Sequence, residues 1–86
     1  MYIIRYEVSN MDIRVLFGKA MRKHRLALGL SQESFALSID MDRTYVASVE
    51  QGKRNLSLIN IQKIADGLGI SMSELFATVE RLSSEL

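Results

Sequence analysis

The sequence contains no cysteine and no proline, and its single histidine is His24. Without cysteine, disulfides and thiolate metal sites are excluded, and one histidine alone is too few ligands for a metal. A glycine-rich phosphate loop is also lacking, and the many serines and aspartates stand where helices are expected to begin rather than in a catalytic arrangement. We therefore expect a protein that is not an enzyme and that binds no metal, cofactor or small-molecule ligand.

Long hydrophobic runs are lacking as well. The longest run without a charged residue is 55–62, which is too short and too polar to span a bilayer. Arg5 and Glu7 lie where the apolar part of a signal peptide would be. Membrane insertion and secretion are therefore not expected, and the composition suits a cytoplasmic protein.

The charge is nearly balanced overall but is unevenly distributed. The 86 residues carry a net charge of +1, and 48% of them are hydrophobic, which suffices for the core of one domain. Residues 11–30 hold five lysines and arginines against Asp12, whereas residues 71–86 hold three glutamates against Arg81. A compact fold with this polarity presents one basic face that can approach phosphate groups.

Capping and stop signals divide the chain into five expected helices. Serine, asparagine and aspartate accept hydrogen bonds from the free N–H groups of a first turn, and glycine often ends a helix. Between these signals the apolar residues follow the 3.6-residue helical period; in the first helix Asp12 falls in the first turn and Leu28 on the inward face. The expected starts are Ser9 or Asn10, Ser31, Asp42, Ser57 and Ser71, and the expected ends of the first four helices are near Gly29, Ile39, Glu50 and Gly69.

Residues 1–10 have a different pattern. Tyr2, Ile4, Tyr6 and Val8 recur at the two-residue period of a strand. A lone strand is unstable, so this segment either pairs, for example with its symmetry mate, or is a disordered extension upstream of a functional start at Met11. The chain is thus divided into an N-terminal extension, 1–10, and one helical domain, 11–86, which ends in a dimerisation helix.

The second and third expected helices are joined by a very short turn at Asp40–Asp42. This arrangement is typical of a helix-turn-helix, whose second helix enters the major groove of DNA. Val46 and Val49 form the inward face of that helix, which leaves Arg43, Thr44 and Ser48 outside. Arginine can donate two hydrogen bonds to guanine, threonine offers a hydroxyl and a methyl group, and small residues permit close approach.

Residues 17–76 resemble the Cro/repressor-type, or Xre, family of helix-turn-helix proteins. The matching stretches are Leu28-Gly-Leu-Ser-Gln-Glu33, Phe35-Ala36 and Thr44-Tyr-Val-Ala-Ser-Val-Glu-Gln-Gly-Lys53. Asp42-Arg-Thr-Tyr-Val46, followed by Glu50 and Arg54-Asn55, is similar to the controller proteins of restriction–modification systems. The resemblance implies an all-α, lambda-repressor-like domain of five helices that binds double-stranded DNA.

The resemblance also implies a role for each matching residue. Arg43, Thr44 and Ser48 are expected at base edges, and Arg25 and Glu50 are expected to form a structural ion pair. The residues expected to contact the DNA backbone are Gln32, Tyr45, Lys53, Arg54 and Asn55. Other interpretations stay open: Gln32 as a polar helix start, Lys53 and Arg54 as a solvated loop, and Arg43 as a partner of Asp40 or Asp42.

Two residues depart from the family pattern. His24 stands where an aliphatic core residue is usual, and it is interpreted as a half-buried neutral histidine, a pH-sensitive weak point or a phosphate contact. Asp40 stands where glycine commonly closes the second helix. Because aspartate tolerates the left-handed backbone region better than most residues, the turn is expected to survive.

A homodimer is expected because one recognition helix covers too few base pairs for useful specificity. Met72, Leu75, Val79 and Leu82 of the fifth helix are the expected interface residues; alternatively, that helix only covers the monomer core. We expect a regulator of a palindromic operator, an activator or a repressor, in the cytoplasm and nucleoid of a bacterium or phage host. The alternatives are an antitoxin that regulates its own promoter, a phage-type repressor or a protein-interaction module.

Overall fold

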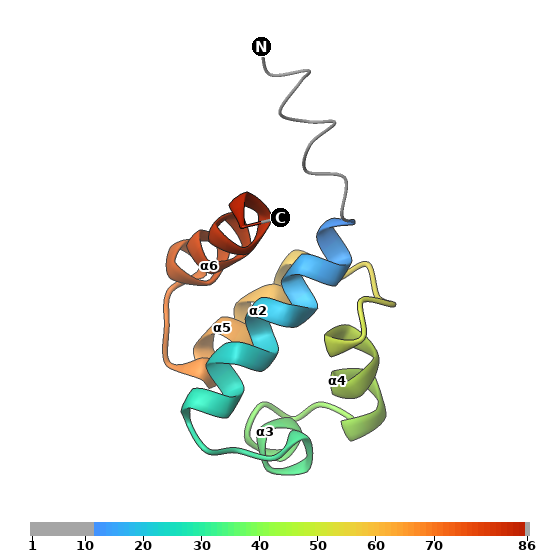
Figure 1. The fold of residues 1–86 in the computed structure, drawn as a ribbon. Coiled ribbons are helices and arrows are strands. Elements are labelled where there is room, and N and C mark those ends of the chain that lie inside the picture. The colour runs from blue at the N-terminus through green and yellow to red at the C-terminus, as the bar shows by residue number, and fades with distance from the viewer. Residues whose placement is uncertain (1–11, 86) are drawn as a thin grey trace.

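A computed structural model describes residues 12–85 of the chain, and these residues form five α-helices and no strand. The helices are α2 (Ile13–Ala27), α3 (Gln32–Ser38), α4 (Arg43–Glu50), α5 (Leu58–Leu68) and α6 (Met72–Ser84) (Figure 1). The expected five-helix fold is therefore confirmed for this range. The two interpretations of residues 1–10 concern a segment outside the described residues.

The start of α2 differs from the sequence expectation. Asp12, expected in the first turn, is the N-cap, and its carboxylate accepts a hydrogen bond of 2.8 Å from the backbone N–H of Arg14. The same carboxylate binds the Arg14 guanidinium, which lowers the pKa of Asp12 to about 2. At the other end α2 stops at Ala27, so that Leu28, expected on the inward face, is exposed.

The other four helices begin where the sequence predicts. The side chains of Ser31, Asp42, Ser57 and Ser71 each accept a hydrogen bond from a backbone N–H of the following turn. Gly69 ends α5 in the left-handed region, at φ 73°. Asp40 adopts φ 56°, so the aspartate does close the turn between α3 and α4 as expected. These local signals set the lengths of the helices.

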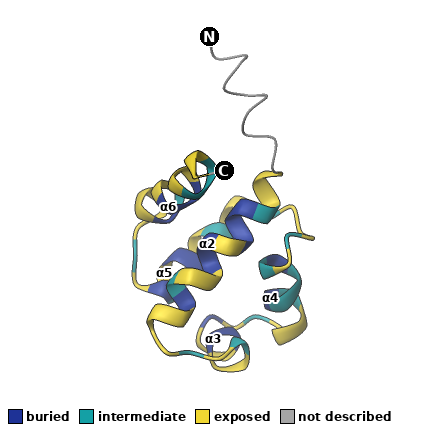
Figure 2. Cartoon of the chain, viewed as in Figure 1, coloured by how far each residue is buried: buried dark blue, intermediate teal, exposed yellow. Residues whose placement is uncertain are grey.

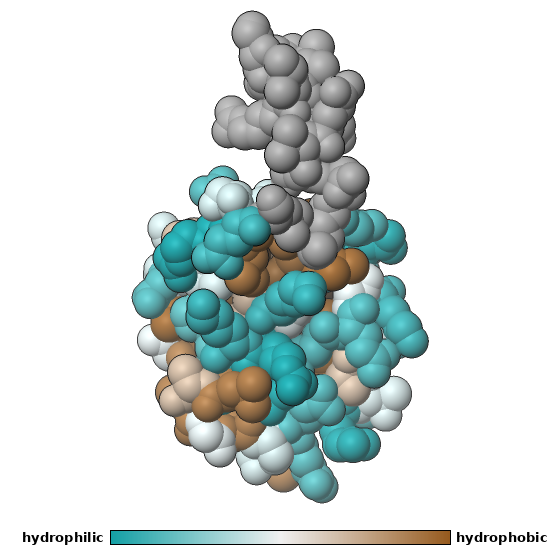
Figure 3. All heavy atoms as spheres, viewed as in Figure 1, coloured by the Kyte–Doolittle hydropathy of each residue, from teal (hydrophilic) through white to brown (hydrophobic). Residues whose placement is uncertain are grey.

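Helix α2 crosses the centre of the domain, with α6 on one side and α4 on the other, and α5 lies behind it (Figure 1). The buried faces of the helices point toward each other (Figure 2). The face drawn in Figure 3 is mostly hydrophilic, with small separate apolar patches. The buried hydrophobic core consists of Leu16, Phe17, Ala20, Met21, Phe35, Ala36, Ile39, Val46, Val49, Ile64, Ala65, Leu68, Leu75 and Val79.

Glycine permits the close approach of α2 to the end of α4. A Cβ atom added at Gly18 would lie 2.5 Å from the carbonyl oxygen of Val49 and 2.6 Å from that of Glu50. Both obstacles are backbone atoms, which cannot turn aside as a flexible side chain can. The position of α4 against α2 therefore depends on the missing side chain at residue 18.

Two residues expected at a dimer interface belong instead to the monomer core. Leu75 and Val79 are buried in the hydrophobic core, because α6 packs this face against α2. Their side chains are therefore not available to a partner. Met72 is exposed and Leu82 is half-buried at the edge of the core, so these two stay predictions for an interface.

His24 is half-buried and joins α2 to α6. Its Nε2 atom lies 2.8 Å from Oγ1 of Thr78, which is itself buried. The Thr78 hydroxyl also accepts a hydrogen bond from Nη2 of Arg81 at 3.1 Å. Of the three interpretations of His24, the half-buried histidine agrees with this geometry, since its ring is engaged inside the domain.

The described residues contain neither a membrane-spanning helix nor a cluster of metal ligands. None of the helices within residues 12–85 is long and apolar enough to cross a membrane. Across the same residues, no group of three or more histidine, cysteine, aspartate or glutamate side chains is placed to hold a metal ion.

Candidate DNA-binding surface

Helices α3 and α4 form the helix-turn-helix predicted from the sequence. Residues 39–42 connect them, and Val46 and Val49 fix α4 to the core. Arg43 and Thr44 are exposed at the start of α4, whereas Ser48, one turn further on, is half-buried. Within the described part of the chain Arg43 makes no ion pair with Asp40 or Asp42, so its guanidinium is not held by either carboxylate.

Arg54 lies across the outer face of α4 instead of extending from its loop. Its Nε donates a hydrogen bond of 2.9 Å to Oγ of Ser48, and its guanidinium carbon lies 5.1 Å from the centre of the Tyr45 ring. The Ser48 hydroxyl in turn donates to the backbone carbonyl of Tyr45 at 2.7 Å. The Ser48 hydroxyl is therefore engaged by both Arg54 and the Tyr45 carbonyl, an arrangement that the residue types alone do not predict.

Tyr45 is anchored at its far end by α5. Nδ2 of Asn60 donates a hydrogen bond of 3.1 Å to the Tyr45 hydroxyl oxygen. The ring is half-buried between this contact and the Arg54 guanidinium. Tyr45 thus holds the loop after α4 to α5, and its hydroxyl can still donate its own proton to a phosphate oxygen.

Arg25 and Glu50 are in direct contact beneath this surface. Nε of Arg25 donates to Oε2 of Glu50 at 2.7 Å and Nη2 donates to Oε1 at 2.9 Å, with side-chain exposures of 5% and 3%. Nη1 of Arg25 donates to the carbonyl oxygen of Leu30 at 2.7 Å. The Glu50 carboxylate raises the pKa of Arg25, so the arginine is charged at any ordinary pH.

Gln32 takes part in the same network. Its Nε2 donates a hydrogen bond of 3.1 Å to Oε1 of Glu50. The amide keeps a second N–H and its carbonyl oxygen, so a phosphate contact is compatible with this geometry. The structure adds a role that the sequence did not reveal, because Gln32 links the start of α3 to the end of α4.

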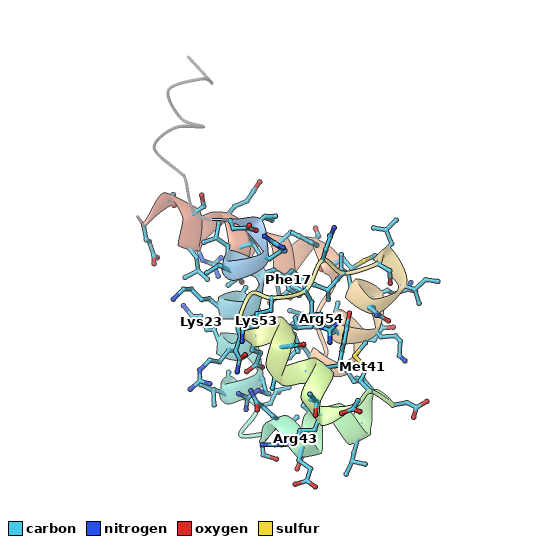
Figure 4. The ribbon with its side chains drawn as sticks, turned by 90° about the vertical axis from the view of Figure 1, so that its right-hand side faces the viewer. Phe17, Lys23, Met41, Arg43, Lys53 and Arg54 are labelled. Atoms are coloured by element: carbon cyan, nitrogen blue, oxygen red, sulfur yellow. The ribbon has the colours of Figure 1, made fainter. Side chains whose placement is uncertain are left out.

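Cationic side chains lie on the side of the domain that carries the outer face of α4. In Figure 4, Arg43, Lys53 and Arg54 lie along the face of α4 and its following loop that is turned to the viewer, and Lys23 of α2 lies beside them. Lys53 and Asn55 are exposed in this loop, as a backbone contact requires. Lys23 was not among the predicted contacts, although it belongs to the run of positive charge between residues 14 and 25.

The sequence is similar to those of known helix-turn-helix proteins over the region that contains α3 and α4. The helix-turn-helix family matches residues 21–75, which include α3 and α4. The control protein C.MunI of Mycoplasma sp is 55% identical over 71 residues, which cover 81% of this chain and 96% of that protein.

Solved structures of controller proteins have the same fold. The restriction–modification controller protein C.AhdI from Aeromonas hydrophila is 50% identical, with a TM-score of 0.70 over 72% of this chain and 94% of that one. The controller protein C.Esp1396I, solved as a tetramer with its natural 35 base-pair operator, is 27% identical, with a TM-score of 0.79 over 85% of this chain and 96% of that one.

Proposed function

The chain belongs to the helix-turn-helix family that includes the restriction–modification control proteins, and on this basis we propose that it regulates transcription as a homodimer bound to a palindromic operator. Its α4 enters the major groove of each half-site. Its role is that of a controller that sets the expression of a restriction–modification operon, and it acts by occupying DNA and not by catalysis.

The observation that carries this proposal is an exposed polar helix face on a rigid support. Arg43 and Thr44 are exposed on α4, while Arg25 and Glu50 hold the end of the same helix from behind. We assign base contacts to Arg43, Thr44 and Ser48. The backbone contacts are assigned to Gln32, Tyr45, Lys53, Arg54 and Asn55.

A dimer recognises more base pairs than one α4 helix can, and so gains sequence specificity. Two recognition helices related by a twofold axis read half-sites about one helical turn, roughly 34 Å, apart. C.Esp1396I assembles as a tetramer on its operator, which supports the same mode of binding for this chain.

Occupancy upstream of a promoter can recruit RNA polymerase, and occupancy over the promoter excludes it. We infer that the protein acts at the bacterial nucleoid, in the cytoplasm.

Selection of bound sites from random duplex DNA, followed by footprinting, tests the proposal. We expect enrichment of an inverted repeat whose half-sites are centred about 10 base pairs apart. Affinity for this repeat is expected to fall steeply with salt, since several phosphates are neutralised in each subunit. A selection without an enriched repeat, or equal affinity for unselected DNA, would contradict the proposed function.

A further inference from the structure

Three cations on α2 have no ion-pair partner among the described residues. The helix holds five lysines and arginines, of which Arg14 is bound by Asp12 and Arg25 by Glu50. The remaining three are exposed, and neither of the two ion pairs within residues 12–85 includes them. They are Lys19, Arg22 and Lys23, which we call the α2 basic ridge.

The charges of the α2 basic ridge repel one another in the free protein. Arg22 follows Lys19 by three residues and Lys23 follows it by four, so that these side chains are neighbours on the helix surface. Like charges at such spacings destabilise a helix. The helix macrodipole does not offset this at Lys19, because its effect is confined to the last turn, where His24 and Arg25 lie. A bound polyanion removes the repulsion.

The loop after α4 lies against the same helix. A Cβ atom added at Gly52 would lie 2.8 Å from Cγ2 of Val15 and 2.9 Å from its Cα atom, so the loop closely approaches the first half of α2. Lys53 follows Gly52 in this loop, and Lys19 follows Val15 by one turn. Figure 4 shows Lys23, one turn further along α2, beside Lys53. The α2 basic ridge therefore continues the positive charge of the candidate DNA-binding surface to one side of it.

Symmetry places the α2 basic ridge on the outer side of the proposed dimer. In a twofold symmetric assembly, residues close to the axis meet the same residues of the partner. Three cations at that place would face three like charges, which is unfavourable. The ridges of the two subunits therefore lie away from the axis, on the sides past which the duplex leaves the palindrome.

Backbone phosphate is the partner that the composition of the ridge fits. Lysine and arginine bind phosphate oxygens through their positive charge, and such contacts position a protein on DNA without reading its sequence. The ridge extends over about 6 Å of α2, from Lys19 to Lys23, and a similar length of duplex carries several phosphates. Each cation can therefore meet a phosphate without displacing its neighbour.

We propose that the α2 basic ridge binds the phosphate backbone of the DNA that flanks the palindrome, outside the half-site that α4 reads. The inference rests on the proposed function, because it extends the contact between the same dimer and the same DNA. The ridge adds affinity without base preference, so that binding depends on the length of the duplex beyond the repeat.

The test compares two duplexes that both contain the selected inverted repeat. The short duplex ends with the repeat, and the long duplex adds about 10 base pairs, one helical turn, on each side. The variant is Lys19→Gln/Arg22→Gln/Lys23→Gln. Its positions are exposed and glutamine is a good helix former, so it is expected to fold. If circular dichroism shows it to be unfolded, Lys19→Gln/Lys23→Gln replaces it.

The wild type should gain more affinity from the flanking DNA than the ridge variant does, by a factor on the order of 10. The two proteins should bind the short duplex within about threefold of each other, because salt screens exposed charges at a distance. On the long duplex, the slope of log affinity against log salt should be smaller for the variant by about 2–3 per subunit. Hydroxyl-radical footprinting should show backbone protection outside the repeat with the wild type only.

Lys23→Gln and Arg81→Gln form a matched pair of single substitutions. Each removes one exposed cation, and Arg81 belongs to α6, which lies on the other side of α2 from α4 (Figure 1). Lys23→Gln should lower the advantage of the long duplex by about twofold or more, since one phosphate contact in each subunit is lost. Arg81→Gln should leave that advantage unchanged, and an equal effect of the two substitutions would overturn the proposal.

Two further results would overturn the flanking contact while the proposed function holds. If the ridge variant loses the same affinity on both duplexes, the ridge acts inside the half-site or through net charge alone. If the variant keeps the full advantage of the long duplex, the ridge does not contact DNA. If the wild type selects no repeat, the proposed function fails, and the flanking contact fails with it because there is no half-site to flank.

Discussion

Arg25 of α2 and Glu50 of α4, 25 residues apart in the sequence, form two parallel hydrogen bonds in a position shielded from water. The pair fixes the last turn of α4 against α2, and the backbone contact permitted by Gly18 brings the two helices together at the same place. The angle at which α4 presents its outer face therefore depends on residues that do not themselves lie on that face.

Replacing Glu50 by alanine is expected to destabilise the fold. The substitution leaves the Arg25 guanidinium buried, with only the Leu30 carbonyl among its present acceptors. The free energy of unfolding, measured with urea, should fall by about 3–5 kcal/mol. The double variant Arg25→Met/Glu50→Met, which buries no charge, should lose less than Glu50→Ala. Equal stability of Glu50→Ala and the wild type would contradict the shielded position of the pair.

Replacing Gly18 by alanine should separate α2 from α4. A Cβ atom at this position meets the carbonyl oxygens of Val49 and Glu50, so the helices must move apart. We expect a loss of about 1–3 kcal/mol in the free energy of unfolding, the usual cost of overpacking. Lys19→Ala, at the exposed neighbour, is the matched control and should stay close to the wild type in the same thermal or urea unfolding experiment.

Replacing Thr78 by valine removes a shared hydrogen-bond partner while it keeps the shape of the side chain. His24 Nε2 and Arg81 Nη2 both contact the Thr78 hydroxyl. Loss of these contacts should lower the free energy of unfolding by about 1–3 kcal/mol, since His24 is half-buried. Ser73→Ala, at an exposed position in the first turn of the same helix, is the control. If both variants melt alike, the contact between His24 and Thr78 does not stabilise the domain.

Replacing Lys53 by alanine should weaken operator binding without a change in base preference. Lys53 is exposed in the loop after α4, beside Arg54, where a phosphate contact is proposed. Losing one phosphate contact lowers the slope of log affinity against log salt by about 1 per subunit. Titrations of the selected repeat at several salt concentrations measure this slope. A change in preferred bases with an unchanged slope would place Lys53 at a base edge instead.

The helices were largely predictable because their signals are local. Ser31, Asp42, Ser57 and Ser71 cap residues that directly follow them, so the sequence alone places four of the five starts. The predicted cap of α2, Ser9 or Asn10, was wrong, because the Asp12 carboxylate accepts the hydrogen bond from the backbone N–H of Arg14. Helix periodicity does not distinguish which of several neighbouring polar residues takes the cap.

The contacts within the candidate site were less predictable. Gln32 meets Glu50 and Arg54 folds over Ser48 only because the tertiary fold brings their elements together, and side-chain type alone does not specify the partner. The Arg25–Glu50 contact was expected through resemblance to a family, not from the residues themselves. Leu75 and Val79 were placed at an interface because helical period identifies an apolar face but does not say whether a core or a partner covers it.

The most direct test of the account is the base preference of an Arg43→Ala variant on the selected operator and on each single-base change of it. Loss of one bidentate arginine contact should cost about 1–3 kcal/mol and relax discrimination at one position of each half-site, with the other positions unchanged. A variant that keeps full affinity and the same preference at every position would contradict the claim that the outer face of α4 reads the DNA.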